Sequence, residues 1–154
     1  SSNKISLLNY HGKILRENIY PLGKKYTGGF TGAIGDLEND GAGEIIFGTS
    51  KGKVGEVIVF DQNLRRIKLR FYPYGNKYVS GVYVAIGDVN KDGKQEIITA
   101  PIDNPRTNIR IFNNKGKMIH EFKDQASFND KTGSCIETID VDYDGSMEIM
   151  AVSL

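Results

Sequence analysis

The sequence predicts an all-β protein made of three four-stranded antiparallel repeats of 52 residues, the pattern of β-propeller blades. Three observations lead to this prediction. An acidic motif recurs without a gap, beginning at Asp36, Asp88 and Asp140, so that successive starts lie 52 residues apart. Short segments rich in β-branched and aromatic residues lie between turn signals. No window sustains the apolar i, i+3, i+4, i+7 spacing of an amphipathic helix.

The second copy of the repeat gives the order of the expected strands. The first strand, at residues 81–87, precedes the acidic motif, and the second, at residues 96–100, follows it. The third strand, at residues 108–112, comes after a turn at residues 104–105, and the fourth lies at residues 117–122. Each segment is short and β-branched or aromatic, and several alternate apolar with polar residues, as half-buried strands do.

The chain is expected to begin on a third strand and to end on a second strand. Residues 5–9 match residues 57–61 and 109–113, and the last predicted strand begins at Glu148. Within a single domain, residues 1–154, the repeat units are therefore 5–56, 57–108 and 109–154. Propellers usually close with four to eight blades, and an open sheet edge is free to pair with another chain. We therefore expect either a fragment of a longer propeller or a homodimer in which two copies close six blades.

Composition and charge exclude several classes of protein. Hydrophobic residues make up 39% of the chain and charged residues 25%, which is ordinary for a globular domain. A net charge of +1 gives no general attraction to nucleic acid or to an anionic membrane, and no apolar stretch approaches the ~20 residues of a membrane span. The single cysteine, Cys135, excludes an intrachain disulfide framework. Because the chain begins at Ser1 without methionine, we expect a processed or excised piece.

The acidic motifs have the ligand pattern of a hard cation and favour calcium. In each motif, positions 1, 3 and 5 carry acid or amide side chains, position 7 offers its carbonyl and position 9 is glutamate. Position 6 is glycine, which predicts a left-handed backbone there, since only glycine adopts it at little cost. The predicted ligands are Asp36, Glu38, Asp40, Ala42 and Glu44 in the first loop, Asp88, Asn90, Asp92, Lys94 and Glu96 in the second, and Asp140, Asp142, Asp144, Ser146 and Glu148 in the third. Carboxylates clustered in this way repel one another without a counter-ion. We expect up to three structural Ca²⁺ ions, each stabilising the hairpin between the first two strands of a repeat.

Two alternatives to this metal site can be weighed from the sequence. An EF-hand requires a glutamate at position 12 and flanking helices, whereas position 12 here is Phe47, Thr99 or Ala151, between predicted strands. An Asp-Gly pair also makes a tight hairpin turn without any metal. The three loops are not equal, because the third has the fullest set of acids, Lys91 lies within the second, and Glu38 in the first is longer than the usual Asp or Asn.

Residues 81–101, GVYVAIGDVNKDGKQEIITAP, resemble the FG-GAP repeat, also called the VCBS or integrin-α N-terminal propeller repeat. Phe47 and Gly48, followed by Gly55, match the Phe-Gly of that name. The bacterial surface-protein version of the repeat is the most similar. The resemblance implies a secreted or cell-surface propeller, usually of seven blades and sometimes of six or eight. It also implies calcium between the first and second strands of each blade, held by positions 1, 3, 5 and 9 and the position 7 carbonyl.

The function we expect is that of a non-catalytic calcium-binding module in adhesion or in binding an unknown protein or carbohydrate ligand. Alternatives are a structural self-assembly or spacer unit and an accessory domain of a carbohydrate-active enzyme. Catalysis is not expected, because His11 and His120 are not matched by the repeat and no nucleophile–base pattern is visible. The repeated tyrosines, such as Tyr26 and Tyr78, are expected either to contact a ligand or to cover the edge of the next sheet.

Overall fold

A computed structural model describes residues 3–103, 108–122 and 134–153 of the chain. These residues form strands and no helix, which confirms the predicted all-β class. The strands are β1 (Ile5–Leu8), β2 (Ile14–Ile19), β3 (Phe30–Gly35), β4 (Glu44–Thr49), β5 (Val57–Phe60), β6 (Ile67–Phe71), β7 (Val82–Gly87), β8 (Glu96–Pro101), β9 (Arg110–Phe112), β10 (Met118–Glu121), β11 (Ser134–Ile139) and β12 (Glu148–Ser153). The turn predicted at residues 104–105 lies outside the described residues.

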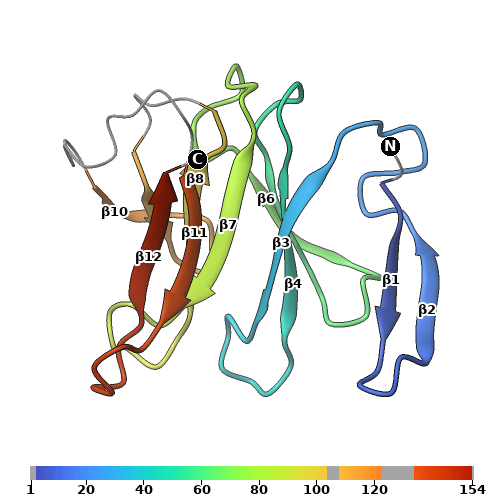
Figure 1. Ribbon diagram of the computed structural model, residues 1–154. Helices are drawn as coiled ribbons and strands as arrows, with labels where there is room; N and C mark the ends of the chain where they lie inside the picture. The colour runs from blue at the N-terminus through green and yellow to red at the C-terminus, as the bar shows by residue number, and fades with distance from the viewer. Residues whose placement is uncertain (1–2, 104–107, 123–133, 154) are drawn as a thin grey trace.

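The strands form two four-stranded sheets and two two-stranded sheets. The four-stranded sheets have the orders β3-β4-β5-β6 and β10-β9-β8-β7, so every strand pairs antiparallel with its neighbour in sequence. The two-stranded sheets, β1–β2 and β11–β12, lie at opposite ends of the row of sheets (Figure 1). The order of strands along the chain therefore agrees with the prediction that the chain begins on the third strand of a repeat and ends on the second strand of another. Among the strands that the structure describes, no sheet closes on itself, and closure into a propeller stays a prediction.

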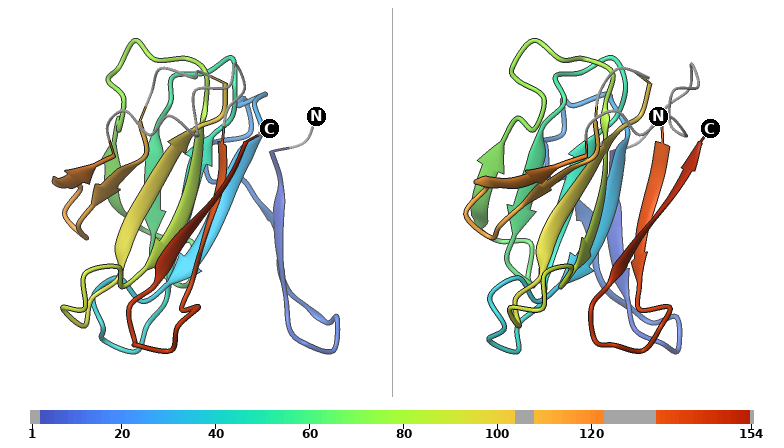
Figure 2. Two further views of the ribbon diagram at one scale, coloured as in Figure 1. Left: turned by 60° about the vertical axis from the view of Figure 1, so that its left-hand side comes forward. Right: turned by 90° about the vertical axis from the view of Figure 1, so that its left-hand side faces the viewer.

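The hairpin of the first two strands has one register in all three repeats. The last residue of the first strand faces the glutamate at position 9 of the acidic loop, in the pairs Gly35↔Glu44, Gly87↔Glu96 and Ile139↔Glu148. Each acidic loop is therefore held at the same place on its hairpin. In both views of Figure 2 the three loops lie at the same end of the molecule.

The core consists of three apolar clusters between successive sheets. Strands β4 and β8 are buried along their whole length. Side chains alternate between the two faces of β4, so Ile46 packs in the cluster with Val84, whereas Ile45 packs toward Leu7 of the β1–β2 sheet. Full burial of one such side chain is worth ~1.5–3 kcal/mol. The apolar runs of the second strands thus explain why these strands lie inside the stack.

Two neighbouring sheets approach each other closely where β4 meets β7. A Cβ atom built on Gly48 would lie 2.3 Å from the carbonyl oxygen of Val82, so only glycine fits without a shift of the backbone. The Thr31 hydroxyl donates to the same Val82 carbonyl at 2.8 Å. At the next junction, the Thr138 hydroxyl donates to the carbonyl of Ile86. The first strands β3, β7 and β11 are therefore joined across the sheets as well as within them.

Candidate metal centres in the acidic loops

The three acidic loops share one backbone conformation. Position 6 has the left-handed φ predicted for its glycine, at Gly41 (83°), Gly93 (81°) and Gly145 (86°). Position 4 is left-handed as well, although it carries a side chain, at Asn39 (54°), Lys91 (61°) and Tyr143 (60°). This second position was not predicted, because non-glycine residues rarely adopt that conformation. One signal in the sequence is Asn39, since asparagine is the side chain that tolerates it best.

Three hydrogen bonds from the backbone to side chains recur in every loop. The position 6 amide donates to the position 1 aspartate, in the pairs Gly41–Asp36 (2.7 Å), Gly93–Asp88 (2.9 Å) and Gly145–Asp140 (3.0 Å). The position 7 amide donates to the position 5 aspartate, in the pairs Ala42–Asp40 (2.9 Å), Lys94–Asp92 (2.9 Å) and Ser146–Asp144 (2.8 Å). The position 2 amide donates to the position 9 glutamate, in the pairs Leu37–Glu44 (3.0 Å), Val89–Glu96 (3.2 Å) and Val141–Glu148 (2.9 Å). These bonds orient the carboxylates, whereas metal binding by the position 7 carbonyls stays a prediction.

The third loop brings three of its predicted ligands together. Carboxylate oxygens of Asp140, Asp142 and Glu148 lie within 4.8 Å of one another. Calcium binds oxygen at 2.3–2.6 Å, so two oxygens on opposite sides of one ion lie up to about 5 Å apart. One calcium ion therefore fits this group. In the described part of the chain, no other three acidic, histidine or cysteine side chains converge this closely.

The fourth predicted acid of this loop, Asp144, has a different partner. One of its oxygens pairs with the Lys91 ammonium of the second loop at 2.6 Å, and the other accepts the Ser146 amide. The neighbouring lysine lowers the pKa of Asp144 below its usual range. Nearby, the Met147 amide donates to the carbonyl of Asp88 at 2.9 Å. Asp144 thus ties the third loop to the second and lies outside the convergent group.

The second loop has a buried carboxylate oxygen, on Asp88, and a buried acid, Glu96, that a cation would stabilise. Oxygen Oδ1 of Asp88 is buried and has no hydrogen-bond partner among the described residues, while Oδ2 accepts the Gly93 amide. Glu96 is 2% exposed, and this burial raises its pKa to about 6. A buried polar atom without a partner is rare and indicates a missing ion or water. The residues of this loop therefore also fit a cation, although Asn90 supplies an amide where the third loop has Asp142.

The first loop already contains a cation from the protein itself. The Lys68 ammonium lies 2.7 Å from a carboxylate oxygen of Glu38 and 2.8 Å from one of Glu44. Both acids hold the charged form of Lys68 and raise its pKa. Two of the five predicted ligands of this loop are thus engaged by one ammonium group.

This role of Lys68 was not predicted from the sequence. The residue lies on β6, the fourth strand of the same sheet. Its equivalents in the other repeats are Arg16 and His120. Glu38 is also the one position 3 residue with the longer side chain. A basic residue on the fourth strand, combined with a long acid in the loop, is the signal that could have identified the pair.

Comparison with protein families gives one match. Residues 88–151 match the family model described as an FG-GAP-like repeat. The match supports an FG-GAP-like repeat in this segment. It contains both the second and the third acidic loops, together with the strands between them. No curated protein and no solved structure matches the chain. In the described residues, no helix is long and apolar enough to cross a membrane.

Tyr78, one of the repeated tyrosines, and the nearby Tyr74 pack between the two four-stranded sheets. The Tyr74 hydroxyl donates to the carbonyls of Thr99 and Asn108, both at 3.0 Å. The rings of Tyr74 and Tyr78 lie with centroids 5.0 Å apart, and both pack against the apolar cluster between the four-stranded sheets. Of the two roles considered for these side chains, the structure supports packing against the next sheet.

Proposed function

We propose that this chain is part of a calcium-stabilised β-propeller module of a secreted or cell-surface protein, and that the module binds a protein or carbohydrate ligand without catalysing a reaction. The observation that carries the proposal is the convergence of Asp140, Asp142 and Glu148 within an FG-GAP-like repeat. The meander order of each four-stranded sheet and the face-to-face packing of the sheets support their role as propeller blades.

We assign calcium to the third loop first and to the second loop next. The third loop offers converging carboxylates, and the second offers Oδ1 of Asp88 without a partner. In the first loop, Lys68 takes the place of the ion. The role of calcium is structural, because each loop joins the end of one strand to the start of its neighbour. An ion there stabilises the hairpin in proportion to the logarithm of its concentration over its dissociation constant.

The proposed location outside the cell follows from the expected affinity and from the family resemblance. Calcium sites in extracellular modules have dissociation constants of about 10⁻⁴ to 10⁻³ M. Sites this weak fill where calcium is abundant and stay empty in a calcium-poor compartment.

The ligand surface is proposed at the end of the molecule that carries the acidic loops. Connections β1–β2, β3–β4, β7–β8 and β11–β12 all lie there (Figure 1). Tyr10 and Tyr143, in the first and last of these connections, are each 92% exposed. Exposed aromatic rings on rigid loops can stack on sugars or anchor a protein partner.

A calcium titration followed by thermal unfolding tests this proposal. At 10 mM calcium, a site of the expected affinity adds about 1.4–2.7 kcal/mol and raises Tm by roughly 3–11 °C relative to the protein in EDTA. Asp142→Ala should remove the part of this shift that comes from the third loop. Glu137→Gln, which changes an exposed acid on β11, should leave it intact. Equal Tm values in calcium and EDTA for the unaltered protein would refute the calcium assignment.

A further inference from the structure

We infer that Lys91 of the second loop competes with calcium for the carboxylate of Asp144 and so lowers the calcium affinity of the third loop. The inference rests on the calcium site proposed for the third loop and adds a residue that regulates it. The Lys91 ammonium lies 2.6 Å from one oxygen of Asp144, Oδ2. Asp144 is the one predicted acidic ligand of the third loop that lies outside the convergent group. The acid that is missing from this group is thus the one that is paired with Lys91.

The position 5 aspartates of the three loops differ in the partner of one oxygen. In every loop, Oδ1 of this aspartate accepts the position 7 amide. In the second loop, Oδ2 of Asp92 accepts from the side-chain amide of Asn90 at 3.4 Å, a neutral group of the same loop. In the third loop, Oδ2 of Asp144 accepts from Lys91, a charged group of another loop. An ion bound at this oxygen would meet the ammonium, and two positive groups at one carboxylate oxygen repel each other.

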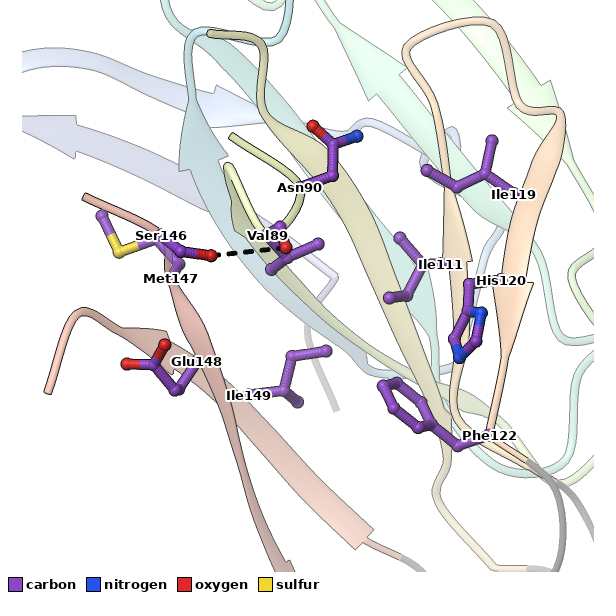
Figure 3. A pocket seen from close by; sticks show the side chains of 10 residues that line it. All are labelled: Val89, Asn90, Ile111, Ile119, His120, Phe122, Ser146, Met147, Glu148 and Ile149. Carbon is purple, nitrogen blue, oxygen red and sulfur yellow. Dashed lines mark hydrogen bonds between the residues drawn. The ribbon is translucent and has the colours of Figure 1, made fainter. Parts of the chain in front are cut away.

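Contacts to the main chain of the second loop keep Lys91 within reach of the third loop. The Met147 amide donates to the carbonyl of Asp88 at 2.9 Å. The Ser146 hydroxyl donates to the carbonyl of Val89 at 3.4 Å, a contact that Figure 3 shows as a dashed line. Both contacts join the residues just before Lys91 to those just after the position 5 aspartate of the third loop. The distance between the ammonium and this carboxylate therefore depends on backbone groups that are themselves held in place.

The charge of Lys91 also acts on members of the convergent group. The pKa of its ammonium is raised, first by the hydrogen bond to Asp144 and also by the charges of Asp142 and Asp140. These last two acids belong to the convergent group. A positive charge in this position stabilises the ionised acids and opposes the approach of a second cation. In the absence of calcium, the lysine is therefore a counter-ion of the third loop.

Solvent exposure distinguishes Lys91 from Lys68 of the first loop. The side chain of Lys68 is 23% exposed and reaches Glu44, whose side chain is 2% exposed. The side chains of Lys91 and Asp144 are 48% and 45% exposed. Ion pairs between exposed side chains contribute little to stability. A divalent ion held by several carboxylates can therefore displace Lys91, whereas Lys68 takes the place of the ion in its own loop.

Competition of this kind acts in both directions. The factor by which the Lys91–Asp144 pair lowers the calcium affinity of the third loop equals the factor by which bound calcium weakens the pair. Without calcium, the pair neutralises Asp144. With calcium, the carboxylate turns to the ion and the lysine is released into solvent.

A calcium titration of the full chain, followed by NMR, tests the role of Lys91. The Gly145 amide donates to Asp140, so its chemical shift reports on the third loop separately from the other loops. Lys91→Gln removes the charge and should lower the calcium dissociation constant measured at this amide by about 3- to 10-fold, as expected for one exposed charge beside a bound ion. Lys91→Arg keeps the charge and should bind calcium as the unaltered protein does. Loss of a residue with only a structural role would loosen the loop and weaken binding, which is the opposite sign.

The matched control is Lys115→Gln, at an exposed lysine of the β9–β10 turn, which should leave the dissociation constant unchanged. An unchanged or higher dissociation constant in Lys91→Gln overturns the inference, and so does an equal effect of Lys115→Gln. If calcium shifts the Gly145 amide equally in the unaltered protein and in Lys91→Gln, the calcium site stands and the inference alone fails. If calcium shifts this amide in neither protein, the proposed calcium site fails together with the inference.

A double-mutant cycle separates competition at Asp144 from a general effect of charge. Asp144→Asn removes the carboxylate for which Lys91 and calcium compete, and should itself weaken calcium binding in the third loop. In this background, Lys91→Gln should change the dissociation constant by less than about 2-fold, because the two residues act through one contact. A change as large as in the chain with Asp144 intact would show that the lysine acts through its charge alone, and would overturn the inference.

Discussion

The ammonium group of Lys68 lies 2.8 Å from the carboxylate of Glu44, which is 1% exposed. Glu44 is the position 9 residue of an acidic loop, where the sequence predicts a calcium ligand. The same structural problem, a buried acid at the start of the second strand, is thus solved here by a basic side chain. The three loops share one backbone conformation and differ in the group that neutralises their acids.

Replacing this lysine should make the first loop dependent on calcium. Lys68→Met leaves Glu44 buried without a counter-ion, so unfolding in EDTA should become easier by about 1–3 kcal/mol, between the values for exposed and fully buried pairs. Added calcium should recover part of the loss and bind with one more equivalent in a calorimetric titration. The control is Arg65→Met, an exposed residue of the same segment, which should change neither quantity. Unchanged calcium stoichiometry in Lys68→Met would contradict the view that the lysine replaces an ion.

The stability of the calcium-free protein should fall as pH rises through the titration of Glu96. Burial raises the pKa of this carboxyl from its ordinary value of 4.5 to about 6, so the folded state holds the proton to higher pH than the unfolded state. Between these pH values the folded protein binds more protons than the unfolded protein. Above pH 6 the free energy of unfolding is therefore lower by about 2 kcal/mol. Glu96→Gln should remove this slope of the unfolding free energy against pH, measured by urea unfolding at pH 4.5, 6 and 7 in EDTA.

The control for this pH series is Glu17→Gln, at an exposed acid of β2, which should keep the slope of the unaltered protein. Saturating calcium should flatten the slope in the unaltered protein, because an ion near Glu96 favours its ionised form. A slope of opposite sign that is independent of residue 96 would show that another group governs this pH range.

Gly48→Ala should destabilise the protein by forcing two sheets apart. The added methyl group would meet the Val82 carbonyl, which belongs to the backbone and cannot rotate away. Overpacking of this kind costs about 1–3 kcal/mol. Gly43→Ala is the matched control, because its Cβ would meet Ile34 at an ordinary 3.7 Å. Urea unfolding should separate the two variants, and equal midpoints would show that the sheets adjust without cost.

Tyr74→Phe should loosen the contact between the segment after β6 and the neighbouring sheet. The hydroxyl is buried and donates to main-chain carbonyls, and its removal takes this donor away from them. A loss of about 1–2 kcal/mol is expected in urea unfolding. Tyr72→Phe, at a tyrosine that is 48% exposed, should stay within about 0.5 kcal/mol of the unaltered protein. A similar small effect at Tyr74 would indicate that solvent replaces its hydrogen bonds.

Much of the fold could be predicted because the chain repeats itself. The positions of β7 to β10, the frame of the chain and the hairpin between the first two strands all follow from residues that recur at one spacing, such as Asp36 and Asp88. The left-handed glycine at position 6 was predicted for the same local reason. These features depend on residues that are close together in the sequence, so a sequence pattern can predict them.

Apart from the left-handed backbone at position 4 of the loops, the unpredicted features arise from contacts between repeats. Lys68 reaches its acids across a sheet, Lys91 reaches Asp144 in the next loop, and Tyr74 bonds to the backbone of another sheet. Gly48 is required because of Val82, 34 positions away in the chain. The sequence repeat does not predict these partners, because equivalent positions carry different residues. The distances between the partners also depend on how the sheets pack against one another.

Position 4 of the acidic loop carries asparagine, lysine or tyrosine on an unchanged left-handed backbone. At Tyr143 the side chain is almost entirely in solvent, one residue from a member of the convergent carboxylate group. A fluorescent label attached at this position would report on occupancy of the adjacent site while leaving the loop frame undisturbed. The indole or phenol of an aromatic residue there would also serve as a light-harvesting antenna for a luminescent lanthanide.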